Sequence, residues 1–268
     1  MRVLTALFLS LILMTSLPAR ADETAFKGRD VSYHDGETEL QGYWVDARNL
    51  PERDHKPAPL VMIVHQWKGL GNYEKGRAGQ LASLGYNAFA VDMYGKGIRP
   101  ADDKAAGAEA GKYKNDPALA RRRITAALDF ARAQPGVDPQ KIVVIGYCFG
   151  GAMALELARS GADVRGVVTF HGDLTTKDPV TKPGVVRAKI EVHHGADDPH
   201  VTQEAVANFI TEMKTADADW TLTQYAHAVH AFTQKDAGND PSKGVAYNAE
   251  ADRKSWAALV MFLKDVLG

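Results

Sequence analysis

The only cysteine of the chain, Cys148, lies in a pattern that is typical of a catalytic nucleophile. The segment around it, residues 141–151, reads K-I-V-V-I-G-Y-C-F-G-G. The apolar β-branched run that stops at Gly146 predicts a strand, and the residues from Ala152 onward predict a helix, so Cys148 is expected in the tight turn between them. The N-terminal end of such a helix favours a thiolate. The pattern therefore predicts nucleophilic chemistry at sulfur, and its alternative is a small buried thiol without a chemical role.

An acid and a histidine follow Cys148 in the chain order of a hydrolase triad. Asp198 comes shortly after a strand-like run at residues 190–194, and His230 follows the next such run, at residues 220–225. In α/β-hydrolases the nucleophile, the acid and the histidine occur in this order, each on a loop after a strand. We therefore expect these three side chains to form a catalytic triad.

Predicted strands and helices alternate along most of the chain, which indicates an α/β fold with a mostly parallel central sheet and helices on both faces. Two alternating runs, residues 31–33 and 40–45, predict an antiparallel pair at the sheet edge. The other predicted elements are strands at residues 60–64, 87–91, 141–145, 166–170, 189–194 and 221–225 and helices at residues 72–84, 117–134, 202–215 and 248–266. Ligands of such sheets bind beyond the carboxyl ends of the strands, where the three candidate residues fall.

One long segment, residues 95–115, lacks a clear hydrophobic period and is rich in Ala, Gly and Lys. It is expected to be a loop with a short helix near residues 105–112. Its position before the candidate nucleophile suggests a lid over the site, and a passive surface excursion is the alternative.

Four segments together resemble the dienelactone hydrolase family. They are G-Y-C-F-G-G around Cys148, G-x-x-D-x-x-V at residues 195–201, H-A-F-T from His230, and V-D-M-Y-G-K-G at residues 91–97. The resemblance covers essentially the whole chain after the N-terminal leader and implies the α/β-hydrolase fold. It also implies a hydrolase of carboxylic ester or lactone bonds that acts on small molecules without a cofactor.

Neighbouring residues compete for two of the triad positions. The G-x-x-D spacing favours Asp198 over Asp197, which is expected to be a solvated loop carboxylate. The match of H-A-F-T to the family favours His230 over His227. The other histidines nearby lack the H-x-x-x-H or H-E-x-x-H spacing of metal ligands, and no cysteine pair exists, so no metal site is predicted.

The predicted mechanism is acyl transfer through a thioester. Cys148 attacks the carbonyl carbon, His230 activates the thiol and later a water molecule, and Asp198 orients the imidazole. The developing negative charge needs preorganised N–H donors, and the backbone N–H of Phe149, directly after the nucleophile, is one. The resemblance places the other at Trp67, whose side chain is alternatively part of the core packing.

Three positions depart from what the resemblance implies. Gln66 stands where the best-known members have a glutamate that takes part in thiol activation. An amide cannot act as a base, so the triad histidine is expected to activate the thiol directly; an impaired or repurposed site is the alternative. Lys96 and Gln234 stand where those members hold a substrate carboxylate with two arginines. We expect Gln66, Trp67, Lys96 and Gln234 to bind the substrate. Without the two arginines, a lactone that carries a carboxylate should be recognised less well, so we expect a broader range of esters or lactones than in those members.

The N-terminal residues 1–21 are predicted to be a secretory signal peptide, because a short basic start precedes an apolar stretch and an A-x-A site. A membrane anchor is the alternative. Residues 22–268 are then expected to form one α/β-hydrolase domain that is periplasmic or secreted, and to act as a monomer. A net charge of −1 gives no reason to expect nucleic acid or membrane as a partner, and the longest basic run, residues 121–123, is expected to be a solvated helix face.

Two other functions compete with hydrolysis. A non-catalytic ligand-binding protein on a hydrolase fold is suggested by Gln66, whereas the complete set of Cys148, Asp198 and His230 argues against it. A thiol redox sensor would use Cys148, but the chain has no second cysteine to resolve a sulfenic acid. The sequence therefore favours an exported ester or lactone hydrolase.

Overall fold

The computed structural model describes residues 28–47 and 57–268, so the predicted signal peptide lies outside the described residues. Within them, eight strands form one sheet with the order β1-β2-β4-β3-β5-β6-β7-β8. The strands are β1 (Arg29–Asp35), β2 (Thr38–Val45), β3 (Ala58–Val64), β4 (Asn87–Val91), β5 (Val137–Tyr147), β6 (Gly166–Phe170), β7 (Lys189–Gly195) and β8 (Trp220–Tyr225). The β1–β2 and β2–β4 pairs are antiparallel and the other pairs are parallel. The predicted edge pair and the mostly parallel sheet are confirmed.

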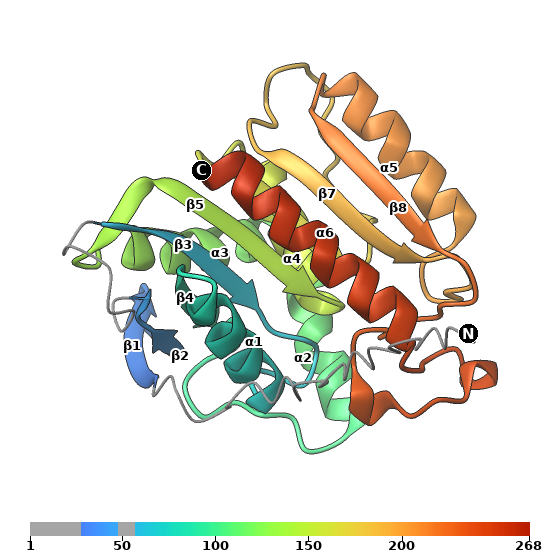
Figure 1. Ribbon diagram of the computed structural model, residues 1–268, viewed down its shortest axis with the longest axis horizontal. Helices are drawn as coiled ribbons and strands as arrows, with labels where there is room; N and C mark the ends of the chain where they lie inside the picture. Colours follow the sequence, from blue (N-terminus) through green and yellow to red (C-terminus); the bar gives the residue numbers. More distant parts are fainter. Residues whose placement is uncertain (1–27, 48–56) are drawn as a thin grey trace, which may run out of the picture.

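Helices cover both faces of this sheet (Figure 1). They are α1 (Asn72–Ser83), α2 (Asp103–Asn115), α3 (Pro117–Arg132), α4 (Phe149–Arg159), α5 (Gln203–Thr215) and α6 (Ala249–Leu267). Along β3, Leu60, Met62 and Val64 pack in the core that α3, α4 and α5 complete. Val61 and Ile63 pack in the core on the opposite face, with α1 and α6. Burial on both faces explains why this strand is a continuous apolar run.

Polar residues directly before the helices set where they begin. The side chain of Asp116 accepts a hydrogen bond from the backbone N–H of Leu119 at 3.0 Å, and Pro117 occupies the first turn of α3. Thr202 and Asn248 cap α5 and α6 in the same way. These are the positions at which the sequence predicts the helices to start. None of the helices in the described ranges is both long and apolar enough to cross a membrane.

The segment without a clear period contains a longer helix than the sequence predicts. The side chain of Asp102 caps α2, and the buried face of the helix consists of Ala106, Ala110 and Tyr113. Two of these three residues are alanines, so the apolar stripe is weak in the sequence. The Tyr113 ring packs edge-on against that of Phe149, with 5.9 Å between the centroids. Helix α2 therefore lies beside the start of α4, and a lid function stays a prediction.

The prediction that the basic run at residues 121–123 is solvated is wrong for Arg123. Its guanidinium is buried and donates to the carboxylate of Asp35 and to the carbonyl oxygen of Met93, both at 2.8 Å. Both partners are far away in the sequence, on or beside the antiparallel edge of the sheet. A local helical pattern does not show which of three successive arginines will meet them.

Candidate active site

Cys148 lies in a sharp turn between β5 and α4. Its backbone has φ 54° and ψ −117°, a conformation that residues other than glycine rarely adopt. The turn is held by a 3.0 Å hydrogen bond from the Cys148 N–H to the carbonyl oxygen of Phe170. A Cβ on Gly146 would lie 2.0 Å from the carbonyl oxygen of Gly150, and a Cβ on Gly150 would lie 2.2 Å from that of Val64. Only glycine therefore fits at these two positions of the turn.

Replacing Gly146 with Ala is expected to destabilise the fold by about 1–3 kcal/mol, because the added methyl group overlaps backbone that cannot move aside. Thermal unfolding followed by circular dichroism measures the change. Gly76→Ala is the matched control, since nothing lies within 4 Å of a Cβ at Gly76 in α1. This control should be neutral or more stable by up to about 1 kcal/mol. Equal melting temperatures for Gly146→Ala and wild type would contradict the packing described for the turn.

Two hydrogen bonds join Cys148, His230 and Asp198. The Nε2 of His230 lies 3.1 Å from Sγ of Cys148, and its Nδ1 lies 2.8 Å from Oδ2 of Asp198. The other oxygen of the buried Asp198 carboxylate accepts the backbone N–H of His200 at 2.8 Å. Because a carboxylate only accepts, Nδ1 carries a proton and Nε2 is left to exchange one with the sulfur. The three predicted residues thus meet in a geometry that nucleophilic catalysis can use.

The surroundings of His230 favour its protonated form. Burial disfavours a charged imidazole, but the negative charge of Cys148 and the hydrogen bond that His230 donates to Asp198 outweigh it and raise the pKa of His230 to about 10. The neighbouring His171 ring lies edge-on at 5.3 Å between centroids. Burial holds the pKa of His171 well below its usual range, so this neighbour stays neutral at physiological pH. An imidazolium on His230 stabilises a thiolate on Cys148.

The backbone N–H groups of Phe149 and Trp67 are available as donors. Neither the N–H of Phe149 nor that of Trp67 donates a hydrogen bond to another described residue. The close approach of Gly150 to β3 brings their two segments together, because a Cβ on Gly150 would lie 2.6 Å from the carbonyl oxygen of His65. The half-buried Trp67 side chain also packs against the core, so its side-chain packing and the predicted role of its backbone are compatible.

Four other residues considered from the sequence lie outside this hydrogen-bonded group. The exposed ammonium of Lys96 pairs with Glu39 at 2.7 Å. Gln234 is half-buried at the start of a short 3₁₀-helix. Asp197 and His227 are exposed, with 3.9 Å between the carboxylate and the ring. Contacts of Lys96 and Gln234 with a substrate stay predictions.

Gln66 lies against a buried carboxylate that the sequence alone does not single out. Its backbone N–H and its side-chain amide donate to Oε1 of Glu74 at 3.3 and 3.4 Å. The second oxygen of Glu74 accepts the N–H of Gly71 at 2.9 Å. Burial raises the pKa of Glu74, and an amide beside it supplies a donor where a second carboxylate would repel. A glutamate in a first helical turn is too common to have revealed this contact.

His193 and His194 are both buried in β7, away from solvent. The Nδ1 of His193 lies 2.9 Å from the hydroxyl oxygen of Tyr225. Within the described part of the chain, no three His, Cys, Asp or Glu side chains are grouped so that they could hold a metal ion.

Known proteins with similar sequences point to one family. The family model "Dienelactone hydrolase family" matches residues 46–267. A carboxymethylenebutenolidase from Pseudomonas sp. is 30% identical over 223 residues, which cover 80% of this chain and 87% of that protein. An uncharacterized protein of Caenorhabditis elegans is 36% identical over 144 residues, which cover 53% of this chain and 91% of that protein.

Solved structures show the same likeness. A dienelactone hydrolase-like promiscuous phosphotriesterase from metagenomic libraries superimposes with a TM-score of 0.84 and 37% identity, covering 91% of this chain and 100% of that one. A structure described as a dienelactone hydrolase of Klebsiella pneumoniae has a TM-score of 0.73 at 20% identity, covering 90% and 99%. The second likeness supports the fold alone.

Proposed function

The chain belongs to the dienelactone hydrolase family, and we propose that it cleaves ester or lactone substrates through a thioester on Cys148. It is a hydrolase of ester or lactone bonds, as its family and its similarity to a carboxymethylenebutenolidase indicate. Family membership favours this activity over the ligand-binding and redox-sensor alternatives. The catalytic roles rest on one observation above all, the 3.1 Å contact between Sγ of Cys148 and Nε2 of His230, with Asp198 behind it.

Acylation begins when the sulfur of Cys148 attacks the carbonyl carbon of the substrate. The carbon–sulfur bond forms, and the carbonyl oxygen takes the negative charge opposite the N–H groups of Phe149 and Trp67. As the carbon–oxygen bond of the ester breaks, the imidazolium of His230 gives its Nε2 proton to the leaving alkoxide. An ester thus releases an alcohol, whereas the new hydroxyl group of a lactone stays attached to the acyl part.

Deacylation uses the same groups with water in place of the alcohol. His230, now neutral, takes a proton from the water molecule as its oxygen attacks the thioester carbon. The carbon–sulfur bond breaks, the carboxylic acid leaves, and Cys148 returns paired with the protonated imidazole. Asp198 stabilises that imidazolium without accepting its proton.

The surroundings of the sulfur favour an apolar or aromatic acyl group. Cys148 and Trp67 are half-buried and pack against one apolar cluster, which includes the ring of Phe149. The ammonium of Lys96 already has a carboxylate partner in Glu39, which weakens it as a ligand for a charged substrate. Because its relatives include a carboxymethylenebutenolidase and a promiscuous phosphotriesterase, lactones and phosphotriesters belong beside simple esters in a substrate screen.

The direct test is mass spectrometry of the protein mixed briefly with p-nitrophenyl acetate. We expect an acetyl adduct on the peptide that contains Cys148, and its decay should match the continued release of nitrophenol. The Cys148→Ala variant should carry no adduct at any time. Rapid turnover with no adduct on a trapped sample would remove the thioester from the mechanism, and an adduct that persists would mean that the site does not activate water.

A further inference from the structure

A buried histidine lies next to the proposed oxyanion donor. We call residues 65–71, which join β3 to α1, the oxyanion loop. Its first residue, His65, is fully buried, and its ring packs against those of Tyr94, at 4.6 Å, and Phe149, at 5.7 Å. The proposed triad does not use this imidazole.

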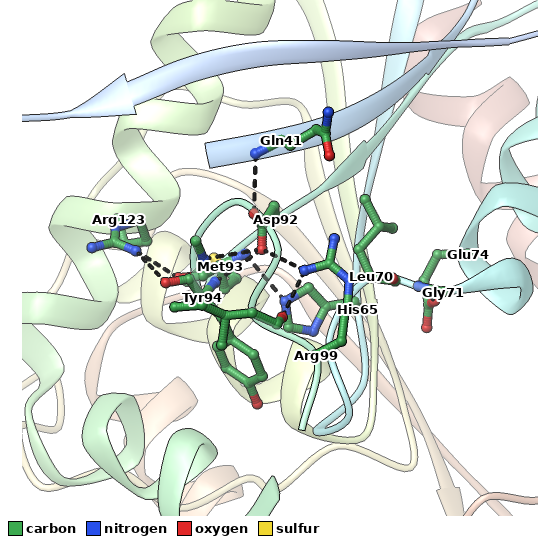
Figure 2. A network of polar contacts seen from close by, with 12 residues as sticks. Gln41, His65, Leu70, Gly71, Glu74, Asp92, Met93, Tyr94, Arg99 and Arg123 are labelled. Carbon is green, nitrogen blue, oxygen red and sulfur yellow. Dashed lines mark hydrogen bonds and ion pairs between the residues drawn. The ribbon is translucent and has the colours of Figure 1, made fainter. Parts of the chain in front are cut away.

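Both ring nitrogens of His65 are occupied by backbone groups. Nε2 accepts the N–H of Met93 at 3.1 Å, so this nitrogen carries no proton. Nδ1 therefore carries it and donates to the carbonyl oxygen of Gln66 at 2.5 Å. Burial lowers the pKa of His65 to about 4, which keeps this neutral tautomer in place across the physiological range. In Figure 2 a dashed line marks the hydrogen bond from Met93 to this ring.

The carbonyl that His65 holds belongs to the same peptide group as the Trp67 N–H. That group is planar and trans, so its C=O and N–H point in opposite directions. The Gln66 oxygen also accepts the N–H of Gly69, at 3.1 Å. Fixing this oxygen on one side fixes the Trp67 N–H on the other, where it has no partner among the described residues.

We propose that His65 is a positioning residue that aims the Trp67 N–H at the oxyanion. This inference rests on the proposed function, because it needs an oxyanion to form at that site. His65 does not touch the reacting atoms; it acts through the Gln66–Trp67 peptide. Its second bond, from Met93, ties the orientation of the ring to the segment that follows β4.

The rest of the oxyanion loop is fastened from both sides. The hydroxyl of Tyr94 donates to the carbonyl oxygen of Trp67 at 2.9 Å, and Nε of Arg99 donates to that of Leu70 at 2.7 Å. Arg99 in turn faces the buried carboxylate of Asp92 at 3.7 Å (Figure 2). From the helix side, Glu74 binds the N–H groups of Gln66 and Gly71. The loop is therefore held before any substrate arrives, as preorganisation requires.

The test compares two substitutions that each keep one of the two hydrogen bonds of the histidine ring. His65→Asn places an amide N–H near the position of Nδ1 and can still donate to Gln66, whereas His65→Gln reaches the position of Nε2 and keeps only an acceptor for Met93. Two rates are measured for each variant: acylation by p-nitrophenyl acetate, and alkylation of Cys148 by iodoacetamide. Alkylation at a saturated carbon develops no oxyanion, so it reports the thiol alone.

We expect His65→Gln to lower the acylation rate by about 10- to 100-fold, because the variant loses part of what one oxyanion donor contributes. The rate of alkylation should change by less than about threefold. His65→Asn should keep acylation within about threefold of wild type. His34→Asn, at an exposed position of β1, is the control for the substitution itself. Equal acylation rates for the Asn and Gln variants, or a parallel fall of both reactions, would overturn the inference.

Tyr94→Phe provides a second route if a His65 variant does not fold. It removes only the hydroxyl that holds the Trp67 carbonyl and keeps the ring that packs on His65. We expect a smaller loss of acylation, about threefold to tenfold, again without a change in alkylation. Unchanged acylation in Tyr94→Phe would contradict the role given to the loop's anchors. Failure of the wild-type protein to acylate at all would instead refute the proposed function.

Discussion

Replacing Cys148 with Ala is expected to lower kcat/KM for p-nitrophenyl acetate by about 10⁴-fold or more, because loss of a nucleophile removes the covalent route altogether. What remains should be the acceleration that binding and the two N–H donors of Phe149 and Trp67 provide. Initial rates of nitrophenol release, corrected for the buffer reaction, measure the effect. Alanine leaves the backbone of the turn intact, so far-UV circular dichroism should be unchanged.

A serine at the same position separates nucleophile chemistry from shape. Cys148→Ser keeps a hydroxyl near His230, but an alcohol gives up its proton far less readily than a thiol. The imidazolium that suits a thiolate therefore does not suit serine, and activity should fall well below that of wild type while exceeding that of Cys148→Ala. A Cys148→Ala variant with nearly full activity would show that another residue is the nucleophile.

The meeting of Cys148, Asp198 and His230 could be predicted, because each of them is tied to a local pattern and their order along the chain connects these patterns. Cys148 stands between a β-branched run and glycines, Asp198 follows the strand that became β7, and His230 follows β8. In a parallel sheet, strands that are far apart in the sequence end at the same edge, so three loops meet without any further information. The hydrogen bonds of 3.1 and 2.8 Å agree with that expectation.

The residues that hold the oxyanion loop could not be predicted, because their partners are backbone atoms of distant segments. His65 contacts the N–H of Met93 and Arg99 contacts the carbonyl oxygen of Leu70. No residue type at the receiving position marks such a contact, since every residue has these backbone groups. The same holds for Arg123, whose partner Met93 contributes its carbonyl oxygen. Sequence patterns indicate which residues can react, whereas the fold shows what keeps them in place.

Replacing His230 with Gln is expected to lower kcat/KM by about a thousandfold, since proton transfer by a positioned base and acid is lost from both steps. The loss should differ from that of Cys148→Ala in one respect, because the sulfur is still present. The rate of alkylation by iodoacetamide, measured as a function of pH, shows how the imidazole changes the reactivity of the Cys148 sulfur. His34→Gln, on the exposed side of β1, is the control.

The sign of the pH dependence follows from the pKa of His230, which is raised to about 10. A raised pKa means that the imidazolium persists below that pH, so wild-type alkylation should depend on pH less steeply than alkylation of the variant that lacks this cation. In His230→Gln no cation faces Cys148, and the rate should be low at pH 6 and increase with pH. A wild-type rate that climbs as steeply as that of the variant would contradict the ion pair.

The same ion pair explains how one histidine can serve as acid in the first step and as base in the second. Its pKa is raised against burial chiefly by the negative charge on Cys148, and that charge disappears when the sulfur is acylated. The pKa of His230 must then fall, which frees Nε2 to accept a proton from water at neutral pH. In stopped-flow measurements deacylation should slow below about pH 6.5, the ordinary value for histidine, whereas the acylation burst should lose less of its rate at that acid end. Parallel acid limbs for the two phases would show that acylation does not change the proton affinity of His230.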